Sequence, residues 1–354
     1  MAKHERWWPI AFFLGGFLFD VVTLSRIDSV ASILQQFVYL TIIALILGFE
    51  IIVAAGRPAP QGRIGRLWSY QEVAVHFMLG SLLSQYTLFF FKSSSLRTSF
   101  LFMAVLLALL VVNEFKRFSG SSGIPMRSGL FSLCLVSFFI CIVPVALGTV
   151  GVLPFLLALA GAGLAAYGYT RWLGKRMGEK STVLKKQFWR PFTLVTGTFA
   201  LLYFTKLIPP VPLAVNYLGI FHDVRKEDGK YVLTYTRPGW KFWQNGDQTF
   251  LARPGDKVYA FAQVFSPGGF KDKIQVHWLL HHPKRGWEGT DAIPMTITGG
   301  RDEGFRGFAI KANYQPGEWQ VRVETADDRE IGRIYFTIEN DSSSEERELR
   351  SISH

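Results

Sequence analysis

Several ionisable and polar side chains interrupt the apolar stretches of the first 208 residues, where burying a charge is costly and often functional. These side chains are Asp20, Arg26, Asp28, Glu50, Glu72, His76, Gln85 and Glu114. Glu72 and His76 are four residues apart, so they share one face of a helix. Such a face could line a polar cavity for transport or lipid handling, or serve a membrane-embedded transferase acting on a lipid-linked substrate. Alternatively, the charges pair at the bilayer interfaces and hold the helices in register.

A second set of charged residues, Arg301, Arg306 and Lys311, lies along one turn and strand of the C-terminal part. Arginine makes bidentate, charge-assisted hydrogen bonds to carboxylates and phosphates, so this set is a candidate ligand face. The neighbouring Asp302 and Glu303 could instead neutralise it. Both alternatives stay open from the sequence.

Three histidines, His277, His281 and His282, suggest a metal site at first sight. On one strand the first two share a face but lie about 13 Å apart, while the third faces the other way. A zinc ion needs ligands about 2 Å away, so we predict no metal site and no cofactor here. Zinc-protease, serine-hydrolase, phosphate-loop and dinucleotide patterns are missing from the sequence, which does not favour a familiar enzyme.

The elements that must hold these residues begin with apolar stretches of membrane-spanning length, which is roughly 20 residues. We predict about seven transmembrane helices within residues 1–208. They are Trp8–Leu24, Ser32–Ala54, Glu72–Phe91, Thr98–Asn113, Leu130–Gly148, Val152–Trp172 and Pro191–Leu207. Cys134 and Cys141 lie about 10 Å apart along the fifth of these, which is too far for a disulfide.

The formal net charge of +11 comes from this apolar part of the chain. Basic residues concentrate in alternate loops, as the positive-inside rule requires of cytoplasmic loops. These loops include Arg57, Arg63, Arg66, Lys116, Arg117, Arg127, Arg171, Lys175, Arg176, Lys185, Lys186 and Arg190. The charge therefore indicates topology and not nucleic-acid binding, and it places the N-terminus in the cytoplasm and the C-terminal domain outside.

The pattern changes after residue 208. Residues 209–220 contain three prolines and are predicted to form a stiff stalk. Residues 221–340 alternate apolar and polar side chains, which favours an extracytoplasmic immunoglobulin-like β-sandwich. Its predicted strands are Tyr231–Arg237, Lys257–Ser266, Lys273–His281, Ile293–Thr298, Phe305–Ala312, Trp319–Thr325 and Ile331–Glu339. Trp278 and Trp319 are the predicted core tryptophans, and residues 341–354 are predicted to be disordered.

The C-terminal part resembles a bacterial family known as domain of unknown function twenty-nine-fourteen. The matching residues are His277-Trp278, Gly299-Gly300-Arg301, Gly304-Phe305-Arg306 and Pro316-Gly317-Glu318-Trp319. The apolar part is similar to the helical region of longer members at Gly16–Asp20, Leu24–Asp28, Phe91–Ser95 and Asn113–Phe115. The resemblance implies a bacterial inner-membrane protein, and it implies no activity and no functional residue.

Taken together, these features favour a non-enzymatic envelope protein over the transport and transferase alternatives. We expect the helices to lie in a lipid bilayer and the β-sandwich to bind an envelope protein or polymer. The sequence leaves the oligomeric state open.

Overall fold

The computed structural model describes residues 27–58, 60–93, 100, 104–105, 123–178, 182–300, 304–343 and 345–354. The chain forms two compact units. A helical unit comprises Met1–Lys92, Leu96–Leu147 and Val152–Val211, and a β unit comprises Ser93–Ser95, Gly148–Gly151 and Pro212–His354. Apolar helices therefore precede an all-β region, as the sequence predicts.

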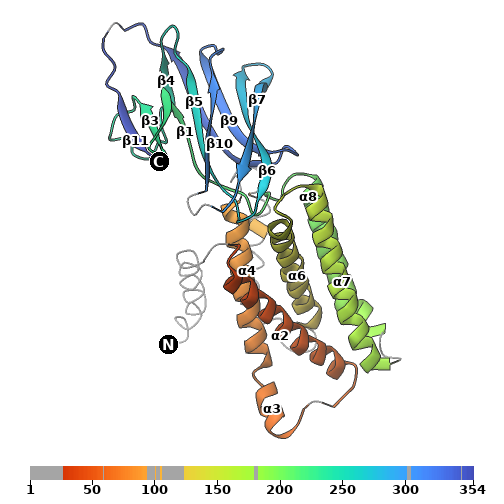
Figure 1. Ribbon diagram of the computed structural model, residues 1–354. Coiled ribbons are helices and arrows are strands. Elements are labelled where there is room, and N and C mark those ends of the chain that lie inside the picture. The colour runs from red at the N-terminus through yellow and green to blue at the C-terminus, as the bar shows by residue number, and fades with distance from the viewer. Residues whose placement is uncertain are drawn as a thin grey trace, which may run out of the picture. The chain divides into compact units, whose positions relative to one another are not determined.

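The described part of the helical unit contains five long helices and two short helical elements (Figure 1). They are α2 (Val30–Ala54), α3 (Gly62–Trp68), α4 (Gln71–Lys92), α6 (Ile124–Leu147), α7 (Val152–Met177) and the π-helical turn η4 (Lys185–Trp189), which continues into α8 (Arg190–Phe204).

Four helices in the described part of the chain are long and apolar enough to cross a membrane: Val30–Ala54, Ala74–Lys92, Ile124–Leu147 and Val152–Met177. The prediction of about seven spans is not supported. The seventh predicted span corresponds to α8, whose 15 residues reach only about 22 Å, short of a bilayer core of about 30 Å. The first predicted span, and all but isolated residues of the fourth, lie outside the described residues.

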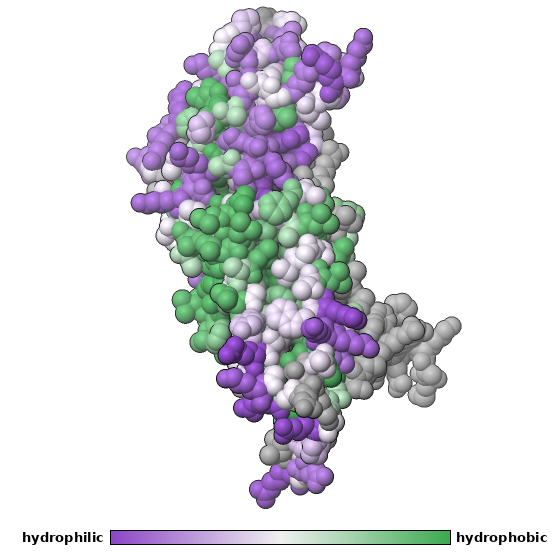
Figure 2. All heavy atoms as spheres, turned by 90° about the vertical axis from the view of Figure 1, so that its right-hand side faces the viewer, coloured by the Kyte–Doolittle hydropathy of each residue, from purple (hydrophilic) through white to green (hydrophobic). Residues whose placement is uncertain are grey.

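The helices pack through narrow faces and leave apolar side chains outside. In α2, Leu40, Ile43 and Leu47 are buried at helical spacing, while Phe37 and Leu45 are exposed. Figure 2 shows hydrophobic side chains gathered over the helical surface. A helix that is apolar on all sides is typical of a membrane span, because lipid can cover the outward side chains.

A close approach fixes α2 against α7. A Cβ atom on Gly48 would come within 2.9 Å of Leu173 Cδ2 and 3.0 Å of Tyr169 Oη. The Tyr169 hydroxyl donates a hydrogen bond of 2.9 Å to the carbonyl oxygen of Ala44. Glycine at position 48 therefore lets the tyrosine ring reach the backbone of the neighbouring helix.

The β unit contains eleven strands among its described residues (Figure 1). They are β1 (Ala214–Phe221), β2 (Asp223–Glu227), β3 (Lys230–Tyr235), β4 (Thr249–Ala252), β5 (Val258–Phe265), β6 (Lys271–His282), β7 (Gly286–Thr298), β8 (Phe305–Lys311), β9 (Gly317–Thr325), β10 (Glu330–Asn340) and β11 (Arg350–Ser353). All seven predicted strands are present, from β3 and from β5 to β10.

Three sheets make up the β unit, with strand orders β4-β10-β9-β6-β7, β1-β5-β8 and β11-β3-β2. The strand pairs are antiparallel except β4 with β10, which are parallel. The main core gathers side chains of the five-stranded sheet and one face of β1-β5-β8. A second core joins the other face of β1-β5-β8 to β2 and β3. Three layers thus share two cores.

Trp278 of β6 and Trp319 of β9 both lie in the main core, at 0% and 2% exposed. The alternation of apolar and polar side chains along these strands predicts this inward position. The indole N–H of Trp319 donates to the carbonyl oxygen of Gln315 at 2.9 Å, which satisfies a donor that burial would otherwise leave unpaired.

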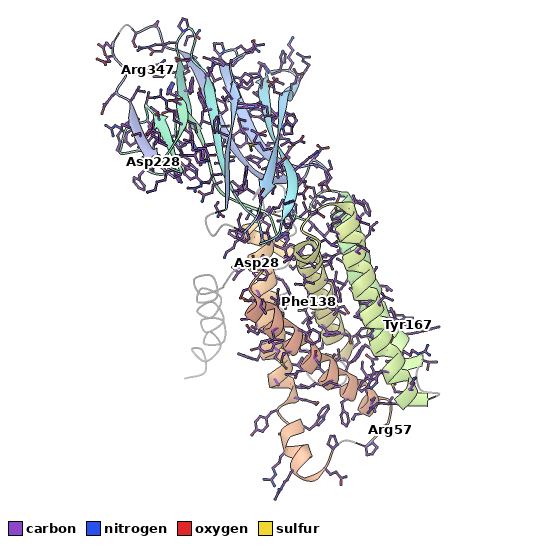
Figure 3. All side chains as sticks on the ribbon, in the orientation of Figure 1. Asp28, Arg57, Phe138, Tyr167, Asp228 and Arg347 are labelled. Atoms are coloured by element: carbon purple, nitrogen blue, oxygen red, sulfur yellow. The ribbon has the colours of Figure 1, made fainter. Side chains whose placement is uncertain are left out.

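Two boundaries differ from those predicted. The predicted stalk ends in β1, which pairs with β5 and buries Leu218 and Ile220, so residues 214–220 belong to the sheet and not to a linker. The predicted disordered tail contains β11, which pairs with β3. Its position is fixed by Arg347, whose guanidinium lies 2.7 Å from the carboxylate of Asp256 (Figure 3). Composition alone does not reveal such long-range pairing.

Candidate functional site

Two of the predicted intramembrane carboxylates converge on a buried arginine in the helical unit. Arg127 Nη2 lies 3.0 Å from Glu50 Oε2, and its Nε donates to the same oxygen at 3.1 Å. Arg127 Nη1 lies 3.8 Å from Glu72 Oε1. The side chains of Arg127 and Glu50 are 3% and 5% exposed, so this ion pair is almost fully removed from solvent.

Helix ends position these three charges. Glu50 lies in the last turns of α2, Glu72 in the first turn of α4 and Arg127 in the first turn of α6. The ends of α2 and α7 also meet, because Arg57 Nη2 donates to the carbonyl oxygen of Arg176 at 2.8 Å (Figure 3). The carboxylates stabilise the guanidinium and the guanidinium holds three helices together, which is the pairing alternative drawn from the sequence.

Arg127 does not lie where the loop charges predict it. The positive-inside pattern assigned it to a loop, whereas α6 begins at Ile124 and buries it. A signal was present, since a buried Glu50 requires a cationic partner and Arg127 immediately precedes an apolar run. The sequence could not say which of the many basic residues supplies that partner.

Of the other predicted intramembrane residues, the structure describes three. Asp28 directly precedes α2, and His76 is half-buried on α4. Gln85 is buried on α4, and its Oε1 has no hydrogen-bond partner among the described residues. The remaining candidates Asp20, Arg26 and Glu114 lie outside the described residues.

The predicted basic face of the β unit is not one face. Arg306 and Lys311 are an odd number of residues apart on β8, so they point to opposite sides of the sheet. Lys311 is buried, pairs with the carboxylate of Asp291 and has its ammonium 5.2 Å from the centre of the Trp319 ring. Arg301 lies outside the described residues. Lys311 therefore belongs to the packing of the sheet.

The outward face of the five-stranded sheet gathers charged side chains instead. Strand pairing sets His277 opposite Arg322, and Arg322 opposite Arg333. Like charges directly opposite each other on neighbouring strands repel and destabilise a sheet. Two adjacent arginines on one face are thus an unfavourable arrangement unless nearby groups, or a bound anion, compensate it.

Nearby glutamates compensate the two arginines only in part. Glu330 pairs closely with Arg333, whereas Glu324 lies 3.9 Å from Arg322. Glu324 Oε2 is also 3.2 Å from Nδ1 of His277, so one carboxylate serves two cationic neighbours. Arg322 Nε donates to Gln320 Oε1 at 2.9 Å.

Aromatic rings continue this face beside the arginines. The Trp287 ring lies 4.9 Å from that of His281 and 5.5 Å from that of Tyr335, between centroids. The Tyr335 hydroxyl accepts a hydrogen bond of 3.0 Å from Arg333 Nη1. Below them, Gln320 is fully buried, and its Nε2 donor has no partner within the described chain. We name Trp287, Gln320, Arg322, Arg333 and Tyr335 the sheet-face cluster.

The strand histidines contact neighbouring carboxylates. His277 contacts Glu324, and His281 Nδ1 lies 3.1 Å from Glu318 Oε2. Within the described residues, no group of three or more His, Cys, Asp or Glu side chains could hold a metal ion. Glycine at position 289 leaves room for His277, because a Cβ there would come within 2.5 Å of the ring Nε2.

Three solved structures align weakly with this chain. Two structures of β-glucosidase from Kluyveromyces marxianus, one in complex with glucose, align at 14% and 12% identity with TM-scores of 0.18 and 0.19. They cover 29% and 44% of this chain, which spans 13% and 17% of theirs. The alkylpurine DNA glycosylase AlkC of Pseudomonas fluorescens, bound to DNA with an abasic-site analogue, aligns at 10% identity. The alignment covers 89% of this chain and 99% of the glycosylase chain, with a TM-score of 0.22. These scores are too low to indicate a shared fold.

No curated protein matches the chain. A family model does match its C-terminal region, over residues 271–338. This segment runs from β6 into β10 and contains the whole sheet-face cluster. The resemblance drawn from the sequence is thereby confirmed for this region: residues 271–338 match the family described as Protein of unknown function (DUF2914).

Proposed function

We propose that this protein is a membrane-anchored binding protein of the bacterial envelope. Its helices would hold it in the inner membrane, and its β unit, an immunoglobulin-like sandwich, would bind an anionic envelope partner through the sheet-face cluster. The observation that carries the proposal is the direct opposition of Arg322 and Arg333, with Trp287 and Tyr335 beside them. Arginine and large aromatic residues are the side chains most enriched in binding hot spots.

The distribution of charge supports an extracytoplasmic β unit. Basic residues follow α2 and surround the junction of α7 with α8, whereas the α6–α7 turn at residues 148–151 carries none. The positive-inside rule makes the basic ends cytoplasmic. The turn at residues 148–151 would then lie on the opposite side, in the periplasm, and it belongs to the same compact unit as Pro212–His354.

The transport and transferase alternatives have weaker support. Glu50 and Glu72, on which they largely depended, contact Arg127 and contribute to helix packing. What still favours these alternatives is the buried Gln85 on α4, beside Tyr86 and Thr87, whose hydroxyls have no partner among the described residues.

In-cell photo-crosslinking of the full-length protein tests the proposed function. A photo-reactive amino acid replacing Trp287 should form a discrete adduct with an envelope component, because this side chain borders the arginine pair. The double substitution Arg322→Gln and Arg333→Gln should abolish the adduct at unchanged membrane abundance. Neutral glutamine keeps much of the side-chain length and removes the charge.

A matched control replaces Lys226 on β2 with the same photo-reactive residue, since this exposed position lies in a different sheet of the β unit. It should give no such adduct. If the adduct survives loss of both arginines, or forms equally from position 226, the sheet-face cluster is not the binding surface.

A further inference from the structure

The loop between β3 and β4 exposes three large aromatic side chains. Trp240, Phe242 and Trp243 are 65%, 80% and 60% exposed. Their rings contact one another, with centroids 5.6 Å apart for the two tryptophans and 5.2 Å apart for Phe242 and Trp243. Folded proteins seldom leave clustered apolar surface in water unless something binds there. We name residues 238–244 the aromatic loop.

A buried carboxylate fixes the base of this loop. Asp247 is 2% exposed and accepts hydrogen bonds from the amides of Thr236 at 3.0 Å and Arg237 at 2.7 Å. Its own amide donates to the carbonyl oxygen of Ile220 at 2.7 Å. Gly246 has a φ of +71°, and a Cβ there would lie 1.9 Å from the Ile220 oxygen, so the turn requires glycine.

Internal hydrogen bonds hold the tip of the loop. The Lys241 amide donates to the carbonyl oxygen of Pro238, and the Gln244 amide donates to that of Lys241, both at 3.1 Å. The Arg237 guanidinium also donates to the Lys241 carbonyl. The aromatic side chains therefore project from a preformed turn, which lowers the entropy that binding would cost.

The charge of the aromatic loop is positive. Lys241 lies within it, with its ammonium 5.3 Å from the centre of the Trp240 ring, and Arg237 directly precedes it. The sequence from 235 to 246 contains no acidic residue. The neighbouring β11 adds Arg350 beside Gly239, although Arg350 also pairs with Glu348.

We propose that the aromatic loop inserts into the interface of a phospholipid bilayer that carries anionic headgroups. Tryptophan is enriched where hydrocarbon meets headgroups, and aromatic residues next to lysine are typical of segments that lie at this boundary. Phe242 is the most exposed of the three and has no polar atom, so hydrocarbon suits it better than the hydroxyl-rich surface of a polysaccharide. Lys241 then meets the negative headgroups.

The bilayer in question is the one proposed to hold the helices. Residues 205–213 form a short tether between α8 and β1, so the aromatic loop stays within a limited distance of the helices. This tether gives the aromatic loop a high effective concentration at that surface, so a weak intrinsic affinity suffices. The inference concerns a different surface from the sheet-face cluster and depends only on membrane anchoring.

Fluorescence of the full-length protein in proteoliposomes tests the inference. An environment-sensitive dye attached at Gln244→Cys should emit at shorter wavelength and be quenched by spin-labelled lipid when the bilayer contains anionic lipid. Cys134 and Cys141 are buried, so the dye should react with the introduced cysteine and not with these two. Lys241→Gln should lower the equilibrium constant for insertion about five-fold, since one basic residue near an anionic surface contributes about 1 kcal/mol.

The combined substitution of Trp240, Phe242 and Trp243 by serine should remove the shift and the quenching. Two controls should change nothing: Ile310→Ser, at an exposed apolar side chain of β8, and a dye at Lys284→Cys, which should report water throughout. Water-like emission from position 244 in anionic proteoliposomes overturns the inference. So does a shift that requires added envelope polymer or protein, because the loop then recognises that partner and not lipid.

Discussion

Arginine and glutamate meet in both units of this protein, with opposite consequences. In the helical unit, Arg127 contacts Glu50 and Glu72 inside an apolar bundle. In the β unit, Arg322 and Arg333 lie side by side on the outward face of a sheet. Arg127 lies near two carboxylates. Arg322 lies 3.9 Å from one carboxylate, that of Glu324, which also contacts His277. The same side-chain chemistry stabilises helix packing in one unit and leaves Arg322 incompletely paired in the other.

Environment explains this difference. An ion pair shielded from water cannot lose one partner without leaving a charge in a medium that solvates it poorly. A charge at a surface can exchange its protein partner for water or for a ligand at little cost. We therefore expect substitution of Arg127 to lower the stability of the helical unit strongly. Substitutions on the sheet face should change stability little and binding strongly.

The largest expected effect is that of Arg127→Ala. It should destabilise the helical unit by about 3–5 kcal/mol, because Glu50 is left buried and unpaired. Arg322→Ala should cost the β unit less than that, because Arg322 is 25% exposed and its removal relieves the repulsion with Arg333. Thermal unfolding of the full-length protein in detergent, followed by hydrogen exchange in each unit, measures both.

The double substitution Arg127→Leu and Glu50→Leu is the matched control for that prediction. It removes both charges and fills the space with apolar atoms, so it should recover most of the lost stability. If Arg127→Ala and Arg322→Ala prove equally mild, burial is not what separates the two arginines.

Acid should weaken the β unit through a buried histidine. Burial and the nearby Arg347 lower the pKa of His222 from 6.5 to about 4, so the ring is neutral at pH 7 and its 3.6 Å contact with Asp247 is not an ion pair. The unfolded chain takes up this proton below pH 6.5 and the folded chain only below about pH 4. Stability should therefore fall between pH 6.5 and 4, by about 3 kcal/mol in total.

Hydrogen exchange of the β unit against pH, compared with His222→Leu, measures this loss. The variant should lack the fall between pH 6.5 and 4, while His282→Gln should keep it. Burial raises the pKa of Asp247, which adds stability as the carboxyl protonates in acid, so the difference between variants isolates the histidine. An unchanged profile in His222→Leu would contradict the assignment.

Lys311 tests whether the predicted basic face has any binding role. Its stem packs in the core near Trp319, and only its ammonium pairs with the half-exposed Asp291. Lys311→Met keeps the stem, so it should change the unfolding free energy by less than about 1 kcal/mol. It should also leave the crosslink from position 287 intact. If Lys311→Met abolishes that crosslink without changing stability, Lys311 is part of the binding surface.

The smallest expected effect belongs to a fully solvated pair. Arg285 Nε lies 2.9 Å from Glu288 Oε1 in the β6–β7 turn, with both side chains exposed. Arg285→Ala should change the unfolding free energy by no more than about 0.5 kcal/mol, and salt should reduce even that. A cost as large as that of Arg127→Ala would break the comparison between buried and exposed pairs.

Local patterns predicted the elements well where neighbours in sequence suffice. Alternation identified the strands from β5 to β10 and the inward position of Trp278 and Trp319. It also identified β3 but missed β1, β2, β4 and β11. The last two are only four residues long and pair with the distant strands β10 and β3. The prediction of about seven spans is not supported, because the last apolar run, Pro191–Leu207, forms α8, which is only 15 residues long.

The sequence by itself therefore determined that apolar helices precede an alternating β region, and that charges near the helix ends needed partners. Only the tertiary structure decided that Arg127 is the partner of Glu50, and that Arg322 faces Arg333. The physical reason is distance along the chain. Hydrophobic periodicity depends on residues that are neighbours in the sequence. The pairing of charges depends on strand register and helix packing between segments that lie far apart in sequence.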